Sequence, residues 1–283
     1  MTKILVTGAK GQLGSDLVRI LNLSGFQVFG MGRSKLDVTN EEVVNKVIQQ
    51  LKPEIIVHCA AYTQVDKAEI EPDIAFLING IGTRNIAIAA ERNHSKLVYI
   101  STDYVFDGQR NQPYNEYDAT NPLMVYGRSK LAGEQIVRDF ASNFFIIRTS
   151  WVFGKHGNNF VKTVLKHGRE KGSLTVVDDQ IGSPTYTMDL ASFILQLVVT
   201  DKYGIYHVSN TGYCSWYEFA KEIIKMAGIQ AELIPCTTEE YPRVASRPAY
   251  SVMDHMAIRT NGFSVLPPWQ DALHRFLREI GEA

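Results

Sequence analysis

The stretch KILVTGAKGQLG, residues 3–14, decides the fold of this chain. A β-branched run leads into Gly8, Gly11 and Gly14, and an amphipathic segment over 12–23 follows. Gly8 permits a tight turn, Gly11 lets a diphosphate approach the backbone, and Gly14 lets the helix pack closely on the sheet. The amides and the dipole at the start of that helix favour an anion. The pattern predicts a loop that holds a nicotinamide dinucleotide, with an ordinary strand–helix turn as the alternative.

Apolar runs and helical patterns alternate through the first half of the chain. Strands are expected over 4–6, 27–31, 55–59, 97–101 and 144–148, and helices over 12–23, 41–51, 72–92 and 125–140. Apolar strands that alternate with helices predict a parallel sheet covered on both faces, with right-handed crossovers. We therefore predict an α/β fold in which residues 1–150 form a Rossmann-type, doubly wound, NAD(P)-binding domain.

The second half, residues 151–283, is less regular. Strands are expected over 175–177 and 205–208, and helices from near 158, over 187–199 and over 216–226; five prolines interrupt the remainder (Pro235, Pro242, Pro248, Pro267 and Pro268). This half predicts a smaller, mixed α/β domain that binds mainly the substrate. We expect its helix near 187–200 to pack back onto the first domain, leaving a cleft between the two.

The composition bounds the partners of the protein. Of 283 residues, 45% are hydrophobic, and the net charge of −1 is spread evenly, which argues against a nucleic-acid partner. Cys59, Cys214 and Cys236 form no CxxC pair, so neither a disulfide framework nor a zinc site is expected. The apolar run before Gly8 is too short for a signal peptide, and no later run would span a bilayer. We expect a cytoplasmic protein with no membrane partner.

An arginine follows the second predicted strand, where an acidic residue would bind the ribose of NAD. Arg33 and Ser34 suit the 2′-phosphate of NADP instead, so NADPH is the expected cofactor, with NADH also open. A surface arginine is the alternative. Asp37 either accepts from the adenine amino group or caps the helix expected to begin near Thr39.

Tyr126 and Lys130 stand four residues apart in YGRSK, on one face of a predicted helix. Lys130 is expected to lower the pKa of the Tyr126 phenol from about 10, so that the tyrosine can donate a proton to a ketone. Thr102 lies at the end of the fourth strand, where ligands of such sheets bind, and can hydrogen-bond the tyrosine and the substrate oxygen. These three are the candidate catalytic residues.

The ordered motifs resemble the extended short-chain dehydrogenase/reductases and, more narrowly, the dTDP-4-dehydrorhamnose reductase family. The stretches that carry the resemblance are TGAKGQLG, HCAAYTQVDKAE, STDYVFDG, NPLMVYGRSKLAGE, RTSWVFG, GNNFVKT, DDQIGSPT and ASRP. They run from Thr7 to Pro248. The resemblance implies NADPH-dependent reduction of C4 of dTDP-4-dehydro-L-rhamnose to dTDP-L-rhamnose, with Tyr126 as proton donor.

The resemblance also implies which residues contact the ligands. Cofactor contacts are implied for Gly11, Gln12, Leu13, Asp37, Val38, Ala61, Tyr62, Thr63 and Lys130, and sugar-nucleotide contacts for Thr102, Asp103 and Trp151. Asp103 has a loop hydrogen bond as its alternative role, and Trp151 a place in the core. Asn159 is a weaker candidate for a nucleotide contact or a helix cap, and Arg247 for a diphosphate clamp or a surface ion pair.

Some members of that family form dimers bridged by magnesium, but Met188 stands near where a carboxylate would be needed; an alignment shifted by one brings in Asp189. We expect no metal, and either a monomer or a homodimer. The competing functions are an epimerase, dehydratase or reductase acting on another nucleotide sugar, and a non-catalytic NADP-binding regulatory subunit.

Overall fold

A six-stranded sheet lies at the centre of the computed structural model, which describes all residues from Met1 to Ala283. Its order is β2 (Gln27–Met31), β1 (Lys3–Thr7), β3 (Ile55–His58), β4 (Lys96–Thr102), β5 (Phe144–Thr149) and β10 (Gly204–His207). All five pairings are parallel. The strand order reverses between β1 and β3, the switch point beside which such sheets bind ligands. The predicted Rossmann-type fold is confirmed.

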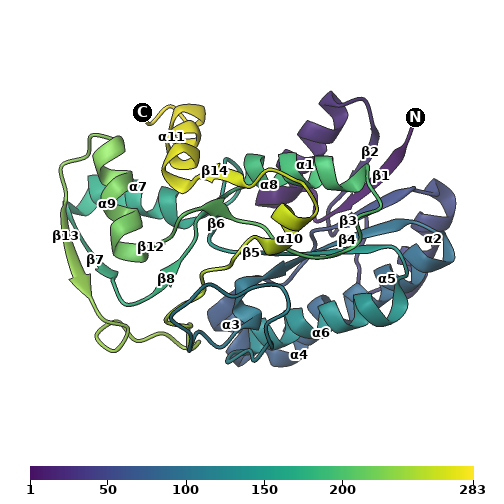
Figure 1. Ribbon diagram of the computed structural model, residues 1–283, viewed down its shortest axis with the longest axis horizontal. Helices are drawn as coiled ribbons and strands as arrows, with labels where there is room; N and C mark the ends of the chain where they lie inside the picture. The colour runs from purple at the N-terminus through teal and green to yellow at the C-terminus, as the bar shows by residue number, and fades with distance from the viewer.

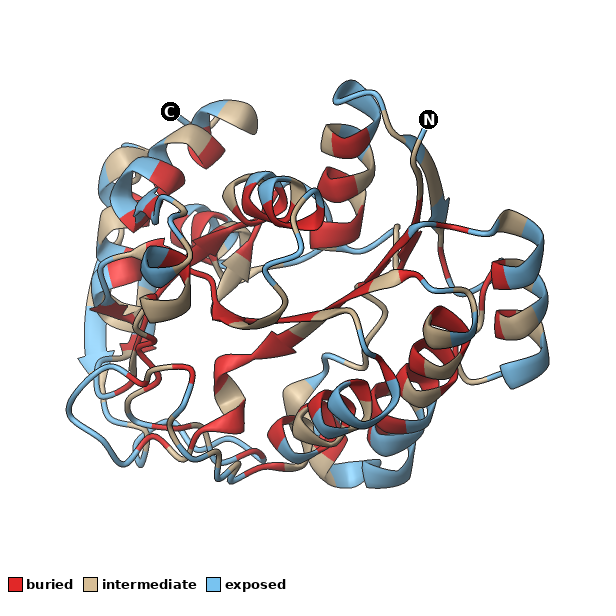
Figure 2. Ribbon diagram, turned by 45° about the vertical axis from the view of Figure 1, so that its right-hand side comes forward, coloured by how far each residue is buried: buried red, intermediate tan, exposed pale blue.

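Helices cover both faces of the sheet (Figure 1). One face packs against α1 (Gln12–Leu23), α8 (Thr187–Val198) and α10 (Met256–Thr260). The other packs against α2 (Glu41–Leu51), α5 (Thr83–Arg92) and α6 (Val125–Phe140). Successive residues of β1 alternate between the two cores, as pleating requires. Figure 2 shows the result: the inner strands of the sheet and the inner sides of the helices are buried, whereas the edge strand β2 and the outer sides of the helices are half-buried or exposed.

The helix predicted over 72–92 is interrupted. The structure has α4 (Pro72–Phe76), then a π-helical turn over Leu77–Gly82, then α5. The turn contains Asn79, whose amide accepts from the backbone N–H of Tyr62 at 2.8 Å and donates to its carbonyl at 3.1 Å. The π-helical turn therefore holds the segment that follows β3 in place. A helical pattern in the sequence does not reveal this contact, because Tyr62 lies outside the helix.

The second half builds a hydrophobic core of its own. Its main elements are β6 (Val152–Phe153), α7 (Phe160–Lys171), β7 (Ser173–Val177), β9 (Thr185–Tyr186), α9 (Trp216–Met226), β13 (Glu232–Cys236) and α11 (Trp269–Glu279). Two features of this half were not predicted. α11 starts directly after Pro268, which occupies its N-cap. β10 leaves this half and pairs with β5 at the edge of the main sheet.

Residues 245–254, which we call the C-terminal strap, return to the first half. The backbone N–H of Tyr114 donates to the carbonyl of Val252 at 2.9 Å, and that of Ser251 donates to the carbonyl of Ile181 at 2.8 Å. The strap runs between the loop that follows β4 and the second half, so it holds the two together.

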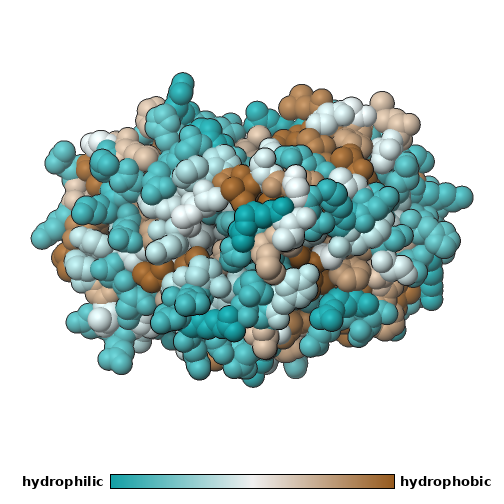
Figure 3. Space-filling model, in the orientation of Figure 1, coloured by the Kyte–Doolittle hydropathy of each residue, from teal (hydrophilic) through white to brown (hydrophobic).

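The structure contains no helix that is both long enough and apolar enough to span a membrane. On the face drawn in Figure 3, hydrophilic residues predominate and hydrophobic ones occur in small, scattered groups. The more exposed large apolar side chains include Leu23, Ile70, Tyr117, Val199 and Val244.

Candidate active site

A cavity of about 850 Å³ lies beyond the carboxyl ends of β1, β3, β4 and β5. It brings together almost every residue that the sequence singles out. The predicted residues that line it are Gly8, Gly11, Gln12, Leu13, Gly14, Arg33, Asp37, Val38, Ala61, Tyr62, Thr63, Thr102, Asp103, Tyr126, Lys130 and Trp151. Asn159 and Arg247 are not among the lining residues.

The glycine loop has the geometry that a diphosphate needs. Gly8 has φ +61°, and a Cβ there would lie 2.7 Å from the backbone nitrogen of Ala60. A Cβ on Gly14 would lie 2.3 Å from the carbonyl oxygen of Gly8. Gly11 is the N-cap of α1, no side chain caps that helix, and its first turn carries no acidic residue. The first amides of α1 are therefore free to donate to an anion at the cavity wall.

Two cationic residues lie where the glycine loop meets the end of β2: Lys10 on the loop and Arg33 after the strand. Arg33 is exposed, and its Nε lies 3.6 Å from Oδ2 of Asp37. The stem of Lys10 covers Gly32, where a Cβ would lie 3.2 Å from the lysine side chain. Lys10 therefore stands beside Arg33 as a second cation. Lys10 was not predicted from the sequence, although it lies within the glycine loop, between Gly8 and Gly11.

Asp37 does not cap α2. Its Oδ1 accepts from the backbone N–H of Thr39 at 3.0 Å and from the Thr39 hydroxyl at 2.8 Å, and these bonds lower the pKa of Asp37. The cap of α2 is Asn40, which accepts from the N–H of Val43 at 3.0 Å. The expected capping alternative is therefore wrong, because the helix begins two residues later than Thr39.

Tyr126 and Lys130 project from α6 toward Thr102 at the end of β4. All three side chains line the cavity. Burial raises the pKa of Tyr126 to about 12, an effect that the nearby Thr102 hydroxyl opposes. Burial also lowers the pKa of Lys130 to about 7, which the charge of Glu134 opposes, and Lys130 Nζ lies 4.1 Å from the centre of the Tyr99 ring.

The expectation that Lys130 lowers the pKa of Tyr126 is not met in this structure. Desolvation dominates at the phenol, and Lys130 is absent from the groups that shift it. Tyr126 is consequently fully protonated at neutral pH. This is the state required of a proton donor, reached by burial and not by charge.

Two buried polar atoms beside the catalytic candidates have no partner. They are Oδ2 of Asp103 and Oγ1 of Thr149, and both residues line the cavity. Thr149 is the residue of β5 that pairs with Thr102 of β4. Since buried polar groups are normally hydrogen-bonded, these two atoms are suited to a polar ligand. Thr149 was not selected from the sequence.

An aromatic wall closes the side of the cavity that the second half provides. The rings of Trp151 and Trp216 are stacked, and both line the cavity. Trp151 has φ +47°, and a Cβ on Gly182 would lie 2.5 Å from its ring. Trp151 is thus held between Gly182 and Trp216, in partial contact with the second core.

Comparison with known proteins agrees with this geometry. A family model described as "RmlD substrate binding domain" matches residues 1–281. The chain is 43% identical to the dTDP-4-dehydrorhamnose reductase of Aggregatibacter actinomycetemcomitans, covering 96% of this chain and 97% of that protein. The chain belongs to the dTDP-4-dehydrorhamnose reductase family. It is also 46% identical to the spore coat polysaccharide biosynthesis protein SpsK of Bacillus subtilis (strain 168), over 100% of this chain and 99% of that one.

Solved structures place the fold in the same reductase family. The dTDP-4-dehydrorhamnose reductase of Bacillus anthracis str. Ames, crystallised in complex with NADP, superposes with a TM-score of 0.97 at 49% identity, covering 99% of this chain and 100% of that one. A UDP-glucose 4-epimerase of Thermus thermophilus has a TM-score of 0.86 at 20% identity, covering 100% of each chain. The epimerase shares the fold alone.

Two residues expected at the ligands of a dTDP-4-dehydrorhamnose reductase have protein partners here. Arg247 donates to both carboxylate oxygens of Asp66, at 3.1 and 2.9 Å, so its guanidinium takes part in an ion pair. Asn159 caps α7 by accepting from Lys162 N–H at 3.0 Å, and it donates to Gln12 Oε1 at 2.9 Å. Asn158, its neighbour, lines the cavity instead.

Asp189 is the carboxylate that a shift of one residue from Met188 would offer to a bridging magnesium ion. It forms an ion pair with Arg275. Arg275 donates to its two carboxylate oxygens at 2.7 and 2.8 Å. A guanidinium therefore already balances the charge of this carboxylate.

Proposed function

We propose that this protein reduces the C4 ketone of dTDP-4-dehydro-L-rhamnose to dTDP-L-rhamnose with NADPH, the last step of dTDP-rhamnose synthesis for cell-surface polysaccharide. The observation that carries the proposal is the convergence of Thr102, Tyr126 and Lys130 on the cavity that the glycine loop also lines. The family relatives of similar length support the substrate.

The cofactor is NADPH, with its diphosphate on the amides at the start of α1 and its 2′-phosphate beside Arg33 and Lys10. Ala61, Tyr62 and Thr63 follow β3 and line the cavity, so they are suited to contact the rest of the dinucleotide. NADPH supplies the hydride when it is bound. NADH uses the same loop but lacks the phosphate that the two cations would bind.

The side chains of this protein position the sugar and supply the proton. The pKa of about 12 keeps Tyr126 protonated, so that it can donate to the oxygen of the reduced ketone. Lys130 contacts the nicotinamide ribose, and Thr102 orients the phenol. Asp103, Thr149 and Trp151 contact the sugar nucleotide. The enzyme acts in the cytoplasm as a monomer or a homodimer.

A second substrate has specific support. The chain is 38% identical to a dTDP-4-keto-6-deoxy-D-glucose reductase of Streptomyces niveus, with 95% of this chain and 94% of that protein covered. The Tyr126 phenol and the hydride of NADPH would reduce the 4-ketone of either dTDP sugar. A direct comparison of the two sugars identifies the preferred substrate.

The test is an NADPH-oxidation assay with purified protein. dTDP-4-dehydro-L-rhamnose is compared with dTDP-4-keto-6-deoxy-D-glucose and with UDP-linked 4-keto sugars. We expect the highest kcat/KM with dTDP-4-dehydro-L-rhamnose and stoichiometric NADPH consumption. Faster turnover of another sugar would reassign the substrate. Conversion without net NADPH consumption would favour an epimerase, and no conversion of any sugar would favour a regulatory subunit.

A further inference from the structure

Residues 154–159, which we call the 154–159 loop, join β6 to α7. At the end of this loop, Nδ2 of Asn159 donates to Oε1 of Gln12 at 2.9 Å and to the carbonyl of Gly154 at 2.8 Å. Gln12 opens α1 and lines the cavity, and its Nε2 donates to the carbonyl of Val152 at 3.5 Å. One side chain at the start of the cofactor helix therefore contacts the second half on both sides of the loop.

The 154–159 loop follows one face of α1. Gln12 and Asp16 are four residues apart, so they share that face. A Cβ on Gly157 would lie 3.3 Å from Cγ of Gln12. One turn further on, Nε2 of His156 lies 3.8 Å from Oδ1 of Asp16, a buried oxygen with no hydrogen-bond partner. The loop thus rests on the first two turns of the helix whose free amides suit the cofactor diphosphate.

Asn159 has two separable roles. Its Oδ1 accepts from the N–H of Lys162 at 3.0 Å and caps α7, whereas its Nδ2 makes the two contacts described above. The preceding four residues, 155–158, are exposed, and Asn158 lines the cavity. Because Asn158 and Asn159 are adjacent, the place of Asn158 at the cavity depends on the hydrogen bonds of Asn159.

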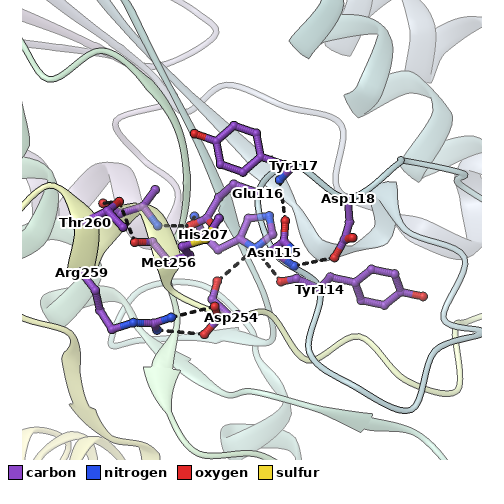
Figure 4. A network of polar contacts seen from close by, with 11 residues as sticks. Tyr114, Asn115, Glu116, Tyr117, Asp118, His207, Asp254, Met256, Arg259 and Thr260 are labelled. Carbon is purple, nitrogen blue, oxygen red and sulfur yellow. Dashed lines mark hydrogen bonds and ion pairs between the residues drawn. The ribbon is translucent and has the colours of Figure 1, made fainter.

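The C-terminal strap joins the two halves through residues that lie outside the cavity. The N–H of Asp254 donates to the carbonyl of Tyr114 at 2.7 Å. Nδ1 of His207 lies 3.0 Å from the same carbonyl oxygen (Figure 4). None of these three residues lines the cavity, so we expect their contacts not to respond to a bound dinucleotide. The contact between Gln12 and Asn159 differs, since it begins at a residue of the cofactor site.

We propose that the hydrogen bond between Gln12 and Asn159 couples binding of the cofactor to binding of the sugar nucleotide, with Asn159 as a positioning residue. The inference rests on the proposed function. A diphosphate on the amides of α1 holds the start of that helix, and with it Gln12. Gln12 then holds the 154–159 loop, so that Asn158 keeps its place at the cavity. The conformational entropy of the loop is lost when the first ligand binds, so each ligand raises the affinity for the other by the same factor.

The test is isothermal titration calorimetry of the purified protein with dTDP, without and with saturating NADP⁺. No hydride transfer can occur, because dTDP carries no sugar and NADP⁺ carries no hydride. For the wild type we expect NADP⁺ to lower the Kd of dTDP about 2-fold to 10-fold, the effect of one uncharged hydrogen bond. The reverse titration should show dTDP lowering the Kd of NADP⁺ by that factor.

Asn159→Ser removes the bridge and keeps the helix cap. A serine hydroxyl can accept from the N–H of Lys162, but it is too short to reach Gln12. We expect the coupling factor to fall to about 1 with the Tm of the protein unchanged. In NADPH oxidation the KM for the sugar nucleotide should rise about 2-fold to 10-fold, with a smaller change in kcat. Gln12→Leu should abolish the coupling from the other side of the bridge.

Asn40→Ser is the matched control. Asn40 caps α2 by accepting from the N–H of Val43 at 3.0 Å, and it does not line the cavity. The same substitution there changes a cap of the same kind without touching the 154–159 loop. We therefore expect the wild-type coupling factor in Asn40→Ser.

A wild-type coupling factor of 1 would overturn the proposal, as would coupling of wild-type size in Asn159→Ser. An equal loss in Asn40→Ser would also overturn it, since the effect would then follow from helix capping in general. Coupled binding of NADP⁺ and dTDP by a protein that reduces no dTDP sugar would instead reject the proposed reductase and support the bridge. The two failures are therefore distinguishable.

Discussion

Trp151 and Trp216 stack with their ring centres 3.5 Å apart and their planes 7° apart. Trp151 follows β5, whereas Trp216 opens α9, where the Ser215–Glu218 capping box fixes the start of the helix. The wall of the cavity therefore joins two segments of the second half that lie far apart in the sequence. Trp151 has φ +47°, and its ring fills the space that a side chain at Gly182 would occupy.

Replacing Trp216 with alanine should loosen this wall. Aromatic pairs contribute about 0.5–1.5 kcal/mol beyond their buried area, so we expect KM for the sugar nucleotide to rise about 3-fold to 10-fold while KM for NADPH stays constant. Steady-state kinetics would measure both. Trp216→Phe is the matched control, since it keeps a stacking ring. A rise in the two KM values by the same factor would contradict a local role at the sugar.

Gly14→Ala should abolish NADPH binding. The new Cβ would meet the backbone of Gly8 and Ala9, at 2.3 and 2.9 Å, so the loop would have to move. Gly80→Ala is the control, because nothing lies within 4 Å of its Cβ position. Fluorescence titration with NADPH would compare the two. Retained affinity in Gly14→Ala would mean that the loop does not hold the diphosphate.

The local features of this chain were readable from the sequence. The helices over 12–23, 125–140 and 216–226 begin and end where the sequence predicts, because the periodicity that marks them is local. The glycine loop and the Tyr126–Lys130 pair are also recognisable from residues that are close together in the sequence. Their convergence on one cavity could be inferred because the carboxyl ends of parallel strands share one edge of a sheet.

The features that the sequence did not reveal depend on contacts between distant residues. Nothing near Trp216 marks it as a partner of Trp151, and nothing near Arg247 shows that Asp66 binds it. The strand over 204–207 has no local sign of its pairing with β5. The pKa of Tyr126 depends on its burial, which only the assembled cavity sets.

Arg33→Ala should reduce the preference for NADPH. A charge-assisted hydrogen bond contributes about 1.5–3 kcal/mol, so we expect KM for NADPH to rise about 10-fold or more and KM for NADH to change little. Lys10→Ala should act in the same direction. Kinetics with both cofactors would measure the change. An equal loss with NADH would place these cations away from the 2′-phosphate.

Glu134→Gln should destabilise the fold. Arg148 donates to the two oxygens of Glu134 at 3.0 and 2.8 Å, and both residues are buried. Leaving the guanidinium unpaired costs about 3–5 kcal/mol, which chemical denaturation would measure. The exposed pair Arg259–Asp254 serves as the control, since Arg259→Ala should cost only about 0–1 kcal/mol. Equal costs at the two sites would show that burial of the first pair does not matter.

The most direct test of the account compares wild-type protein with Tyr126→Phe in the oxidation of NADPH by dTDP-4-dehydro-L-rhamnose. Phenylalanine keeps the ring but cannot give a proton, so we predict a loss in kcat of about 10²-fold to 10⁴-fold with NADPH affinity preserved. Wild-type turnover in Tyr126→Phe would contradict the assignment of Tyr126 as the proton donor.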